Sequence, residues 1–373
     1  MNDLSLTVVQ VLPALEAGGV ERGTVEVAAE LVRRGHRAIV VSGGGRLETE
    51  LTGTGAEHMR LAVGRKSPLT LRHVFALRRI LERTNADILH PRSRLPAWIA
   101  RLAWRGMPPE RRPHFITSVH GPYSVNAYSR IMVRGERIIA ISGFIHKYIM
   151  ENYPDTEHER IVIIPRGVDP ARFPHGYRPP REWLSQWRQQ QPQLQGKFIA
   201  CLPARITRWK GQEDFLKIIA RLRDAGIPVH GLAVGGAEHR RQRFLHELQQ
   251  TVEKSGLQEY ITFLGHRGDL REIMSSADVV FSLAREPEAF GRTALEALSL
   301  GTPVIGYDHG GAGEVLQEIF PAGRVAPLNV TAAADKAALF YRQPPAVPDN
   351  NPFTLQRMLD ATLSLYQSTA NTG

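Results

Sequence analysis

Short runs of apolar residues recur along the chain and alternate with stretches of helical periodicity. The first run, residues 6–12, is followed by a turn with Gly18-Gly19, a helical stretch over 20–34 and a second apolar run at 38–41. A glycine-containing turn between a buried strand and a helix is typical of a βαβ unit of about 30 residues. Further strands of the first half are predicted at 87–90, 115–120, 137–141 and 161–164. Runs of this kind are typical of parallel strands buried on both faces.

The same alternation starts again in the second half of the chain. Residues 165–196 are rich in Pro, Arg, Gln and Trp and lack a sustained period, so they are predicted to connect two domains, with one short helix around 183–190. Beyond them the pattern predicts a helix at 212–225 and strands at 197–202, 229–234, 261–264, 279–283 and 303–306. This order predicts an α/β protein with two doubly wound, Rossmann-like domains.

The expected domains follow from these breaks. Residues 1–178 form an N-terminal domain, 179–196 the connection, and 197–350 a C-terminal domain. Residues 351–373 contain a helical pattern over 353–367 that is expected to pack back on the first domain, followed by a tail.

The composition is that of an ordinary globular protein, because 42% of the 373 residues are hydrophobic and 23% are charged. Cys201, the only cysteine, excludes an internal disulfide and cysteine-based metal sites, and its apolar neighbours predict a buried structural thiol. No stretch has the roughly 18 consecutive apolar residues of a membrane-spanning helix, and the first residues lack the basic region of a signal peptide. We therefore expect a cytoplasmic protein. Its net charge of +10 favours anionic partners, which include phosphorylated substrates, acidic membrane surfaces and nucleic acid.

The stretch 285–298 carries the most informative chemistry. A predicted strand ends just before it, and a helix begins near Gly291-Arg292-Thr293. Backbone amides at such a helix start stabilise a bound anion, for example a diphosphate. Glu288 lies in the loop and Glu296 about a turn into the helix, so the two acids must have different roles. Two isolated glutamates would be ordinary surface acids, but their place beside a glycine at a helix start favours a ligand site.

Glu288 and Glu296, with seven residues between them and Phe290-Gly291 inside that interval, resemble the paired-glutamate motif of retaining GT-B glycosyltransferases of the group 1, or family 4, type. Residues 205–211 resemble the strand-to-helix turn in which that family binds the donor diphosphate. Other stretches match the family in order and context, namely 17–21, 120–121, 167–169, 235–238 and 263–265. The resemblance spans roughly residues 8–325, and Pro165-Arg166 departs from it where many members have Asn.

The resemblance implies two Rossmann-like domains that face a central cleft, and transfer of a hexose-type sugar from a nucleoside-diphosphate sugar to a glycan or glycolipid acceptor with retention at the anomeric carbon. It also implies roles for individual residues. Arg205 and Lys210 would hold the diphosphate, together with the backbone amides of Gly291, Arg292 and Thr293. Glu296 would bind the ribose hydroxyls and Glu288 the donor sugar near the reacting carbon. His120 would act from the opposite domain, and Gly18 and Gly19 would let the backbone approach the donor phosphates or the acceptor.

Each of these residues also has a plain structural interpretation. Arg205 and Lys210 could be ordinary cations, but cations at a helix start oppose its dipole, which favours a bound anion. His120 could be a structural histidine, and Gly18-Gly19 could be only a tight turn. The sequence has no Asp-X-Asp triplet and no His-Glu-X-X-His motif, so we expect transfer without a metal and no cofactor other than the nucleotide-sugar substrate.

A basic segment, residues 91–105 followed by Arg111 and Arg112, contains Trp98 and Trp104 between its arginines. It is either a solvated helix with tryptophans in the core or a surface that docks on anionic lipid at the inner face of the membrane, or on a phosphorylated glycolipid. Residues 18–24 resemble the lipopolysaccharide-core branch of the family, which implies a role in cell-envelope polysaccharide biosynthesis.

Two other functions stay open at the level of the sequence. A GT-B-shaped sugar-nucleotide 2-epimerase would share both domains and the diphosphate site. A basic nucleic-acid-binding protein is supported by charge alone, because the chain has no aromatic ribonucleoprotein motif, KH loop or zinc finger, and nucleic acid is not the expected partner. The donor base, UDP or GDP, is not determined by the sequence, and neither is the acceptor.

Overall fold

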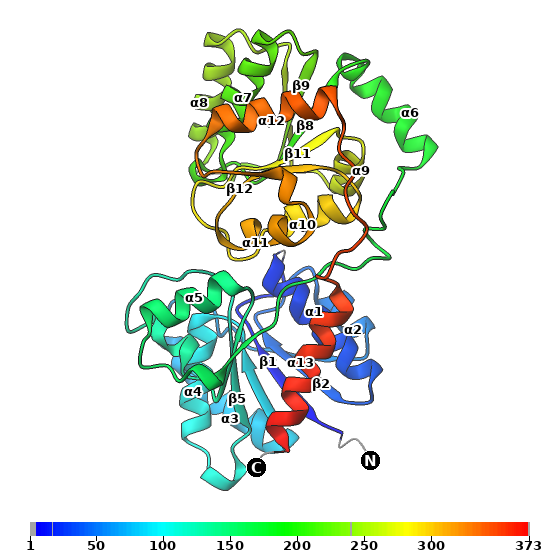
Figure 1. Ribbon diagram of the computed structural model, residues 1–373. Helices are drawn as coiled ribbons and strands as arrows, with labels where there is room; N and C mark the ends of the chain where they lie inside the picture. Colours follow the sequence, from blue (N-terminus) through cyan, green and yellow to red (C-terminus); the bar gives the residue numbers. More distant parts are fainter. Residues whose placement is uncertain (1–4, 17, 239–240, 372–373) are drawn as a thin grey trace. The chain divides into compact units, whose positions relative to one another are not determined.

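The computed structural model describes residues 5–16, 18–238 and 241–371, and it divides the chain into two compact units (Figure 1). The N-terminal unit contains Met1–Pro165 and Gln356–Gly373, and the C-terminal unit contains Arg166–Leu355. Each unit is built on one parallel sheet, with seven strands in the first and six in the second. The predicted fold class, two doubly wound α/β domains, is therefore confirmed.

The sheet of the N-terminal unit has the strand order β3-β2-β1-β4-β5-β6-β7. Its strands are β1 (Thr7–Val11), β2 (Arg37–Ser42), β3 (Glu57–Arg60), β4 (Ile88–Pro91), β5 (His114–Val119), β6 (Arg137–Ala140) and β7 (Ile161–Ile163). Its helices are α1 (Gly19–Arg33), α2 (Glu48–Gly53), α3 (His73–Thr84), α4 (Arg94–Arg105) and α5 (Gly143–Asn152). The strand order reverses between β1 and β4, and doubly wound sheets bind ligands outside the carboxyl ends of the strands at such a reversal.

The C-terminal unit repeats this design with the strand order β10-β9-β8-β11-β12-β13. Its strands are β8 (Phe198–Pro203), β9 (Val229–Val234), β10 (Ile261–Gly265), β11 (Val279–Ser282), β12 (Val304–Tyr307) and β13 (Arg324–Val325). Its helices are α6 (Arg181–Gln190), α7 (Gln212–Asp224), α8 (Gln242–Lys254), α9 (Leu270–Ser275), α10 (Arg292–Ser299), α11 (Gly310–Ile319) and α12 (Val330–Arg342). Here the reversal falls between β8 and β11.

Short 3₁₀ helices complete the connections in both units. They are η1 (Pro68–Arg72), η2 (Pro109–Arg111), η3 (Ser129–Val133), η4 (His158–Arg160), η5 (Pro192–Leu194), η6 (Arg208–Lys210) and η8 (Pro321–Gly323).

The last helix, α13 (Leu355–Ala370), packs on the N-terminal unit, as the sequence predicts (Figure 1). Tyr366 is fully buried, and its hydroxyl lies 2.6 Å from Nδ1 of His90 at the end of β4. Nε2 of the same histidine lies 2.6 Å from the Ser118 hydroxyl on β5. These buried polar contacts fix α13 in one position, because a buried polar atom that loses its partner is costly.

Cys201 is buried in β8, where burial raises the pKa of its thiol. Because the thiolate is the reactive form, this cysteine is the structural thiol that its apolar neighbours predict. Among the described helices, none combines the length and the apolar character needed to cross a bilayer.

Candidate functional site

A pocket of about 300 Å³ lies in the C-terminal unit at the carboxyl ends of β8, β9 and β10. Five of the residues predicted to bind the donor line it: Arg205, Lys210, Arg292, Thr293 and Glu296. They come from the turn after β8 and from the first two turns of α10, two segments that are far apart in the sequence. The structure therefore brings together the cations and the helix start that the sequence assigns to one anion site.

The turn that carries Lys210 depends on the glycine that follows it. Gly211 has φ +80°, and a Cβ there would lie 2.1 Å from the carbonyl oxygen of Leu283. Only glycine fits this position, which begins α7 directly after the lysine. The Lys210 ammonium lies 4.3 Å above the centre of the Trp209 ring, so the aromatic face also stabilises the cation.

Lys210 forms an ion pair with Oε1 of Glu288, and the two side chains are only 16% and 18% exposed. The loop that carries this glutamate is held from two sides. The Gly311 amide, at the start of α11, donates to the Glu288 carbonyl over 2.7 Å. The Arg285 guanidinium binds the buried carboxylate of Asp214 in α7, with nitrogen–oxygen distances of 3.1 and 3.2 Å. These contacts hold the loop so that Glu288 stays within reach of Lys210.

Gly291 is the N-cap of α10 and has φ +81°. A Cβ at this position would lie 2.5 Å from the Cα of Ala312, so α10 and α11 approach each other as only glycine permits. A glycine N-cap has no side chain to accept hydrogen bonds from the first amides, which leaves them available for an anion. Nε of Arg292 donates to Oε1 of Glu296 over 2.9 Å, one turn further along the helix. One oxygen of the second motif glutamate therefore has an internal partner.

Arg205 extends from the turn after β8 with 66% of its side chain exposed, and its guanidinium lies 3.6 Å from Oε1 of Glu238. Beside it the chain turns after β9 at Gly235, where a Cβ would lie 2.0 Å from the Ala204 carbonyl oxygen. Gly235 thus allows the turns after β8 and β9 to lie against each other at the pocket wall.

The lining residues that the prediction missed include His266, Arg267 and Leu270. They lie in the segment after the strand predicted at 261–264, and the carboxyl ends of parallel strands meet at one edge of a sheet. That rule alone could have identified them. Nε and a terminal nitrogen of Arg267 bind the Asp269 carboxylate at 2.8 and 2.6 Å, and this hydrogen-bonded acid raises the pKa of the guanidinium.

Comparison with known families agrees with this geometry. Residues 17–172 match the family model described as Glycosyltransferase Family 4, and residues 185–351 match that of Glycosyl transferases group 1. The chain belongs to the group 1 glycosyltransferases.

Several characterised proteins are similar to this glycosyltransferase. Mannosylfructose-phosphate synthase of Agrobacterium fabrum is 31% identical over 183 residues, which cover 47% of this chain and 38% of the relative. The lipopolysaccharide core biosynthesis mannosyltransferase LpsB of Rhizobium meliloti is 27% identical over 190 residues, which cover 51% of this chain and 50% of the relative. The matched part thus spans half or less of the length of these relatives.

Solved structures extend the similarity over almost the whole chain. A glycosyltransferase from Rickettsia africae superposes with a TM-score of 0.82 at 29% identity, with 98% of each chain covered. Anabaena HepE, solved in complex with UDP-glucose, gives a TM-score of 0.75 at 20% identity and covers 98% of this chain and 97% of its own. The GT-B fold expected from the sequence is confirmed by these neighbours.

The N-terminal unit of the glycosyltransferase carries the three remaining predicted site residues, Gly18, Gly19 and His120. Gly18 has an extended backbone with φ 168°, and α1 begins at the next residue, so neither glycine is required by a left-handed conformation. A Cβ at Gly19 would meet nothing within 4 Å, and one at Gly18 would meet only the flexible end of Glu21. The tight-turn interpretation therefore gives no reason for glycine here. Ala17 lies outside the described residues.

His120 directly follows β5 and is partly buried at the carboxyl edge of the N-terminal sheet. Its backbone amide donates to the Tyr123 hydroxyl over 3.3 Å. The predicted residues thus divide between the units: the cations and both glutamates lie in the C-terminal unit, and His120 lies with the two glycines in the N-terminal unit.

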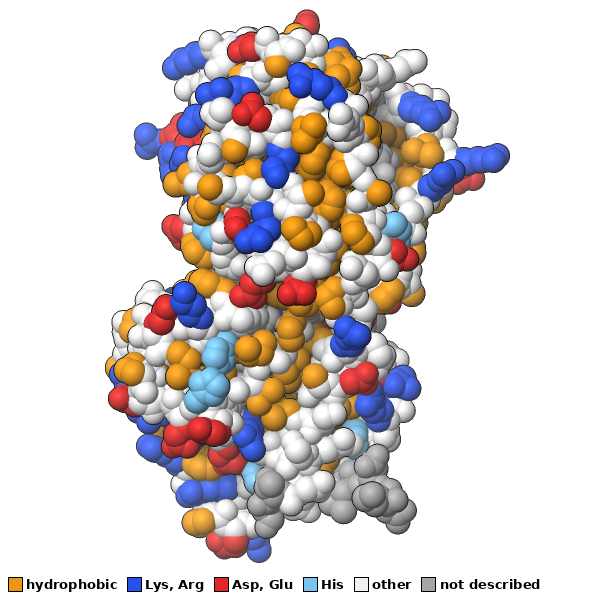
Figure 2. Space-filling view, in the orientation of Figure 1, with side chains coloured by type: hydrophobic (Ala, Val, Ile, Leu, Met, Phe, Trp, Pro, Cys, Tyr) orange, Lys and Arg blue, Asp and Glu red, His pale blue; other side chains and the backbone are white. Residues whose placement is uncertain are grey.

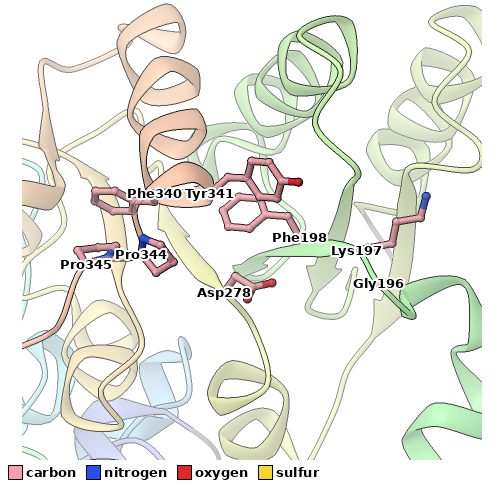
Figure 3. A pocket seen from close by; sticks show the side chains of 8 residues that line it. All are labelled: Gly196, Lys197, Phe198, Asp278, Phe340, Tyr341, Pro344 and Pro345. Carbon is pink, nitrogen blue, oxygen red and sulfur yellow. The ribbon is translucent and has the colours of Figure 1, made fainter.

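A second cavity of the C-terminal unit, about 240 Å³, lies at the opposite ends of the strands (Figure 3). Phe198 begins β8, Asp278 directly precedes β11, and Tyr341 belongs to the last turn of α12. The Phe198 and Tyr341 rings meet edge to face with their centres 5.5 Å apart. The carboxyl end of a helix carries partial negative charge, so this cavity does not suit a diphosphate.

Proposed function

We propose that the chain is a retaining glycosyltransferase that moves a hexose-type sugar from a nucleoside-diphosphate sugar to a glycan or glycolipid acceptor. The observation that carries the proposal is the pocket in which Arg205, Lys210 and the uncapped start of α10 converge, with Glu288 paired to the lysine. Negative charge grows on the leaving diphosphate as the glycosidic bond breaks. Preorganised cations and amides at that position lower the barrier.

The proposed roles follow the geometry of the pocket. The cations and the first amides of α10, those of Arg292 and Thr293, hold the diphosphate. Glu296 accepts hydrogen bonds from the ribose hydroxyls. The diphosphate draws Lys210 away from Glu288, and the freed carboxylate then binds the sugar hydroxyls. His120, Gly18 and Gly19 contribute contacts to the sugar and acceptor from the N-terminal unit.

In the reaction, the bond between the anomeric carbon and the diphosphate oxygen breaks, and the acceptor hydroxyl oxygen bonds to the same face of that carbon. The hydroxyl proton passes to the departing phosphate oxygen. The configuration is thus retained without a nucleophilic side chain. Because Arg205, Lys210 and the helix amides neutralise the leaving group, we propose that transfer needs no metal.

The acceptor that we propose is a glycolipid of lipopolysaccharide or another cell-envelope polysaccharide, made at the inner face of the membrane. Residues 18–24 resemble that branch of the family, and one relative is a lipopolysaccharide core mannosyltransferase at 27% identity. A solved protein of the same fold binds UDP-glucose, which makes UDP-sugars the first donors to test, followed by GDP-sugars.

The test begins with thermal shift against UDP- and GDP-sugars and continues with nucleotide release in the presence of candidate glycolipids. Lys210→Ala and Glu288→Gln should each reduce turnover at least about tenfold, roughly 1.4 kcal/mol in the barrier. Lys254→Ala, at an exposed lysine of α8, serves as the matched control and should leave turnover unchanged. Near-normal rates in both site variants would contradict the proposed site.

Three further readouts test the finer parts of the proposal. The anomeric configuration of the product, measured by NMR, should equal that of the donor, and an inverted product would exclude retention. Turnover should persist in EDTA, and a loss that magnesium or manganese restores would show a metal requirement. Nucleotide release should depend on the acceptor, whereas an epimerase would give none during steady turnover.

A further inference from the structure

The N-terminal unit exposes three large apolar side chains within seven residues of the chain. Leu69 and Leu71 belong to η1 and are 71% and 54% exposed, and Phe75, in the first turn of α3, is 65% exposed. Leu69 and Phe75 are the two most exposed large hydrophobic side chains in the described part of the molecule. A single exposed leucine is common on a protein surface and needs no explanation. Several exposed apolar side chains in one short segment are unusual and mark an interaction site.

The segment is held in a fixed shape by its other face. Thr70 and Val74 are buried, and Leu77 is part of the hydrophobic core. The Thr70 hydroxyl donates to the Arg65 carbonyl over 2.6 Å, and the Ser67 hydroxyl accepts from the Leu69 amide over 3.3 Å. The apolar side chains therefore project from an ordered element and not from a loose loop.

Leu71, near the end of η1, and Phe75, in the first turn of α3, are four residues apart in two helices that follow each other directly. That spacing places two side chains on the same side of a helical segment. The Arg78 guanidinium lies 5.8 Å from the centre of the Phe75 ring, which adds a cation to that face.

Along the sequence, cations flank the apolar side chains, and no acid lies between Glu57 and Glu82. The flanking cations Arg65, Lys66, Arg72 and Arg79 are all exposed. Burial, together with the charges of Arg72 and then Arg65, lowers the pKa of His73, so both arginines lie close to this histidine at the start of α3. The segment 65–79, called the docking patch below, thus combines an apolar centre with a positive border.

We propose that the docking patch binds the surface of an anionic lipid bilayer. Leu69, Leu71 and Phe75 would enter the boundary between head groups and acyl chains, and the surrounding cations would bind lipid phosphates. An apolar face bordered by Lys and Arg is the arrangement that binds such an interface, and each cation near it strengthens the binding to anionic lipid. The inference rests on the proposed function and deepens it, because it names the surface that would hold the chain at the membrane, and lipid binding is measured without donor or acceptor.

The basic segment singled out in the sequence is less suited to this role, since many of its side chains are used inside the unit. Arg92 is buried and donates to Oε1 of Gln10 over 2.7 Å. Nε1 of Trp104 donates to the Pro113 carbonyl, and the guanidinium groups of Arg101 and Arg112 each lie 4.7 Å from the centre of the same indole. These groups stabilise α4 and its surroundings and offer little to a membrane.

The test is flotation of the whole protein with vesicles of phosphatidylcholine alone and of phosphatidylcholine with a third phosphatidylglycerol. We expect binding to the anionic vesicles to exceed binding to the neutral ones about tenfold and to weaken in high salt. Leu69→Ser/Leu71→Ser/Phe75→Ser should reduce anionic binding about tenfold. Because these side chains are exposed, the melting temperature should stay unchanged.

The matched control replaces two exposed leucines of the C-terminal unit, Leu328→Ser/Leu339→Ser, and should bind vesicles like the wild type. A second variant, Arg65→Ser/Arg72→Ser, should lose the preference for anionic lipid while it keeps the apolar side chains. Equal binding of the wild type to both vesicles, or undiminished binding of the triple variant, would overturn the proposal and leave a protein partner as the occupant. Thermal shift with nucleotide sugars, run on the same variants, should be unaffected, so failure of the donor site and failure of the docking patch are told apart.

Discussion

Lys210 and Glu288 neutralise each other in a pocket that is assigned to a diphosphate. Removal of the ammonium alone leaves a carboxylate of low exposure without its partner, where it would repel the phosphates. The two side chains are 78 residues apart in the sequence, so their pairing could not be predicted from the motifs that contain them. What the motifs did predict is that both residues belong to one site.

A double-mutant cycle measures this coupling. Lys210→Ala should weaken binding of a nucleoside diphosphate at least about tenfold, and addition of Glu288→Gln should restore part of the loss, since the second change removes the repulsion. Isothermal titration calorimetry on the single and double variants gives the interaction free energy. Strictly additive losses would show that the pair does not act as a unit.

Gly19 poses a different question at the same scale, because neither backbone conformation nor neighbouring atoms require glycine there. Gly19→Ala should leave stability unchanged or raise it by about 0.4–1 kcal/mol, since alanine restricts the unfolded chain. Turnover should nevertheless fall if a ligand approaches this backbone. Gly53→Ala, in α2 and equally free of contacts, is the control for both melting temperature and rate. Normal turnover of Gly19→Ala would contradict the assignment of this glycine to the site.

At the scale of elements, the sequence predicts the strands that read as apolar runs, including the edge strands β7 and β10, and misses β3 and β13, which have no such run. β1, β8 and β9 are almost entirely buried and read as apolar runs. β3 (Glu57–Arg60) is an edge strand with partly exposed side chains, and its sequence, EHMR, has no apolar run. β13 has only two residues. Such strands are specified by pairing with a neighbour, which local patterns do not contain.

Two carboxylates link the end of α1 to α13: Asp360, which pairs with Arg34, and Glu30. Glu30 accepts hydrogen bonds from Arg33 and Arg34 of α1 and from Gln356 of α13. The Arg33 guanidinium, followed by Arg34 and Gln356, lowers the pKa of Glu30 from 4.5 to about 2 against the opposing effect of burial. A depressed carboxyl pKa stabilises the fold above the unfolded value, and this stabilisation is lost as the pH falls from about 4.5 toward 2.

Glu30→Gln should therefore destabilise the N-terminal unit by on the order of 1–3 kcal/mol near neutral pH. The difference from the wild type should shrink as the pH falls below about 4.5. Urea unfolding followed by circular dichroism at several pH values measures this difference. A difference that stays constant down to low pH would mean that the charge of Glu30 is not what stabilises the contact.

The charged side chains are dispersed on the face that Figure 2 shows. On this face, Lys and Arg side chains stand among Asp and Glu on both units and do not form one continuous basic field. Many arginines also have acidic partners, for example Arg208 with Glu247 and Arg324 with Asp308. A nucleic-acid-binding protein would be expected to gather its cations on one face.

Two units with separate cores should unfold in two steps. Tyr366→Ala removes a fully buried ring of α13 and should reduce the free energy of unfolding of the N-terminal unit by about 3–5 kcal/mol. Only the melting temperature of that unit should fall. Phe281→Ala, in the core of the C-terminal unit, should move only the other transition. Differential scanning calorimetry separates the two. A single transition that both variants shift equally would show that the units unfold together.

The chain leaves the N-terminal unit after Pro165 and re-enters it at Gln356. A ribosome therefore makes all of the C-terminal unit before it makes the helix that covers His90. During that interval the later half can fold completely while the earlier half still lacks its last layer, which reverses the usual order in which domains mature during synthesis. A nascent chain that stalls short of residue 356 would carry a finished C-terminal unit and an unfinished N-terminal unit with bare apolar surface, the kind of surface that chaperones bind.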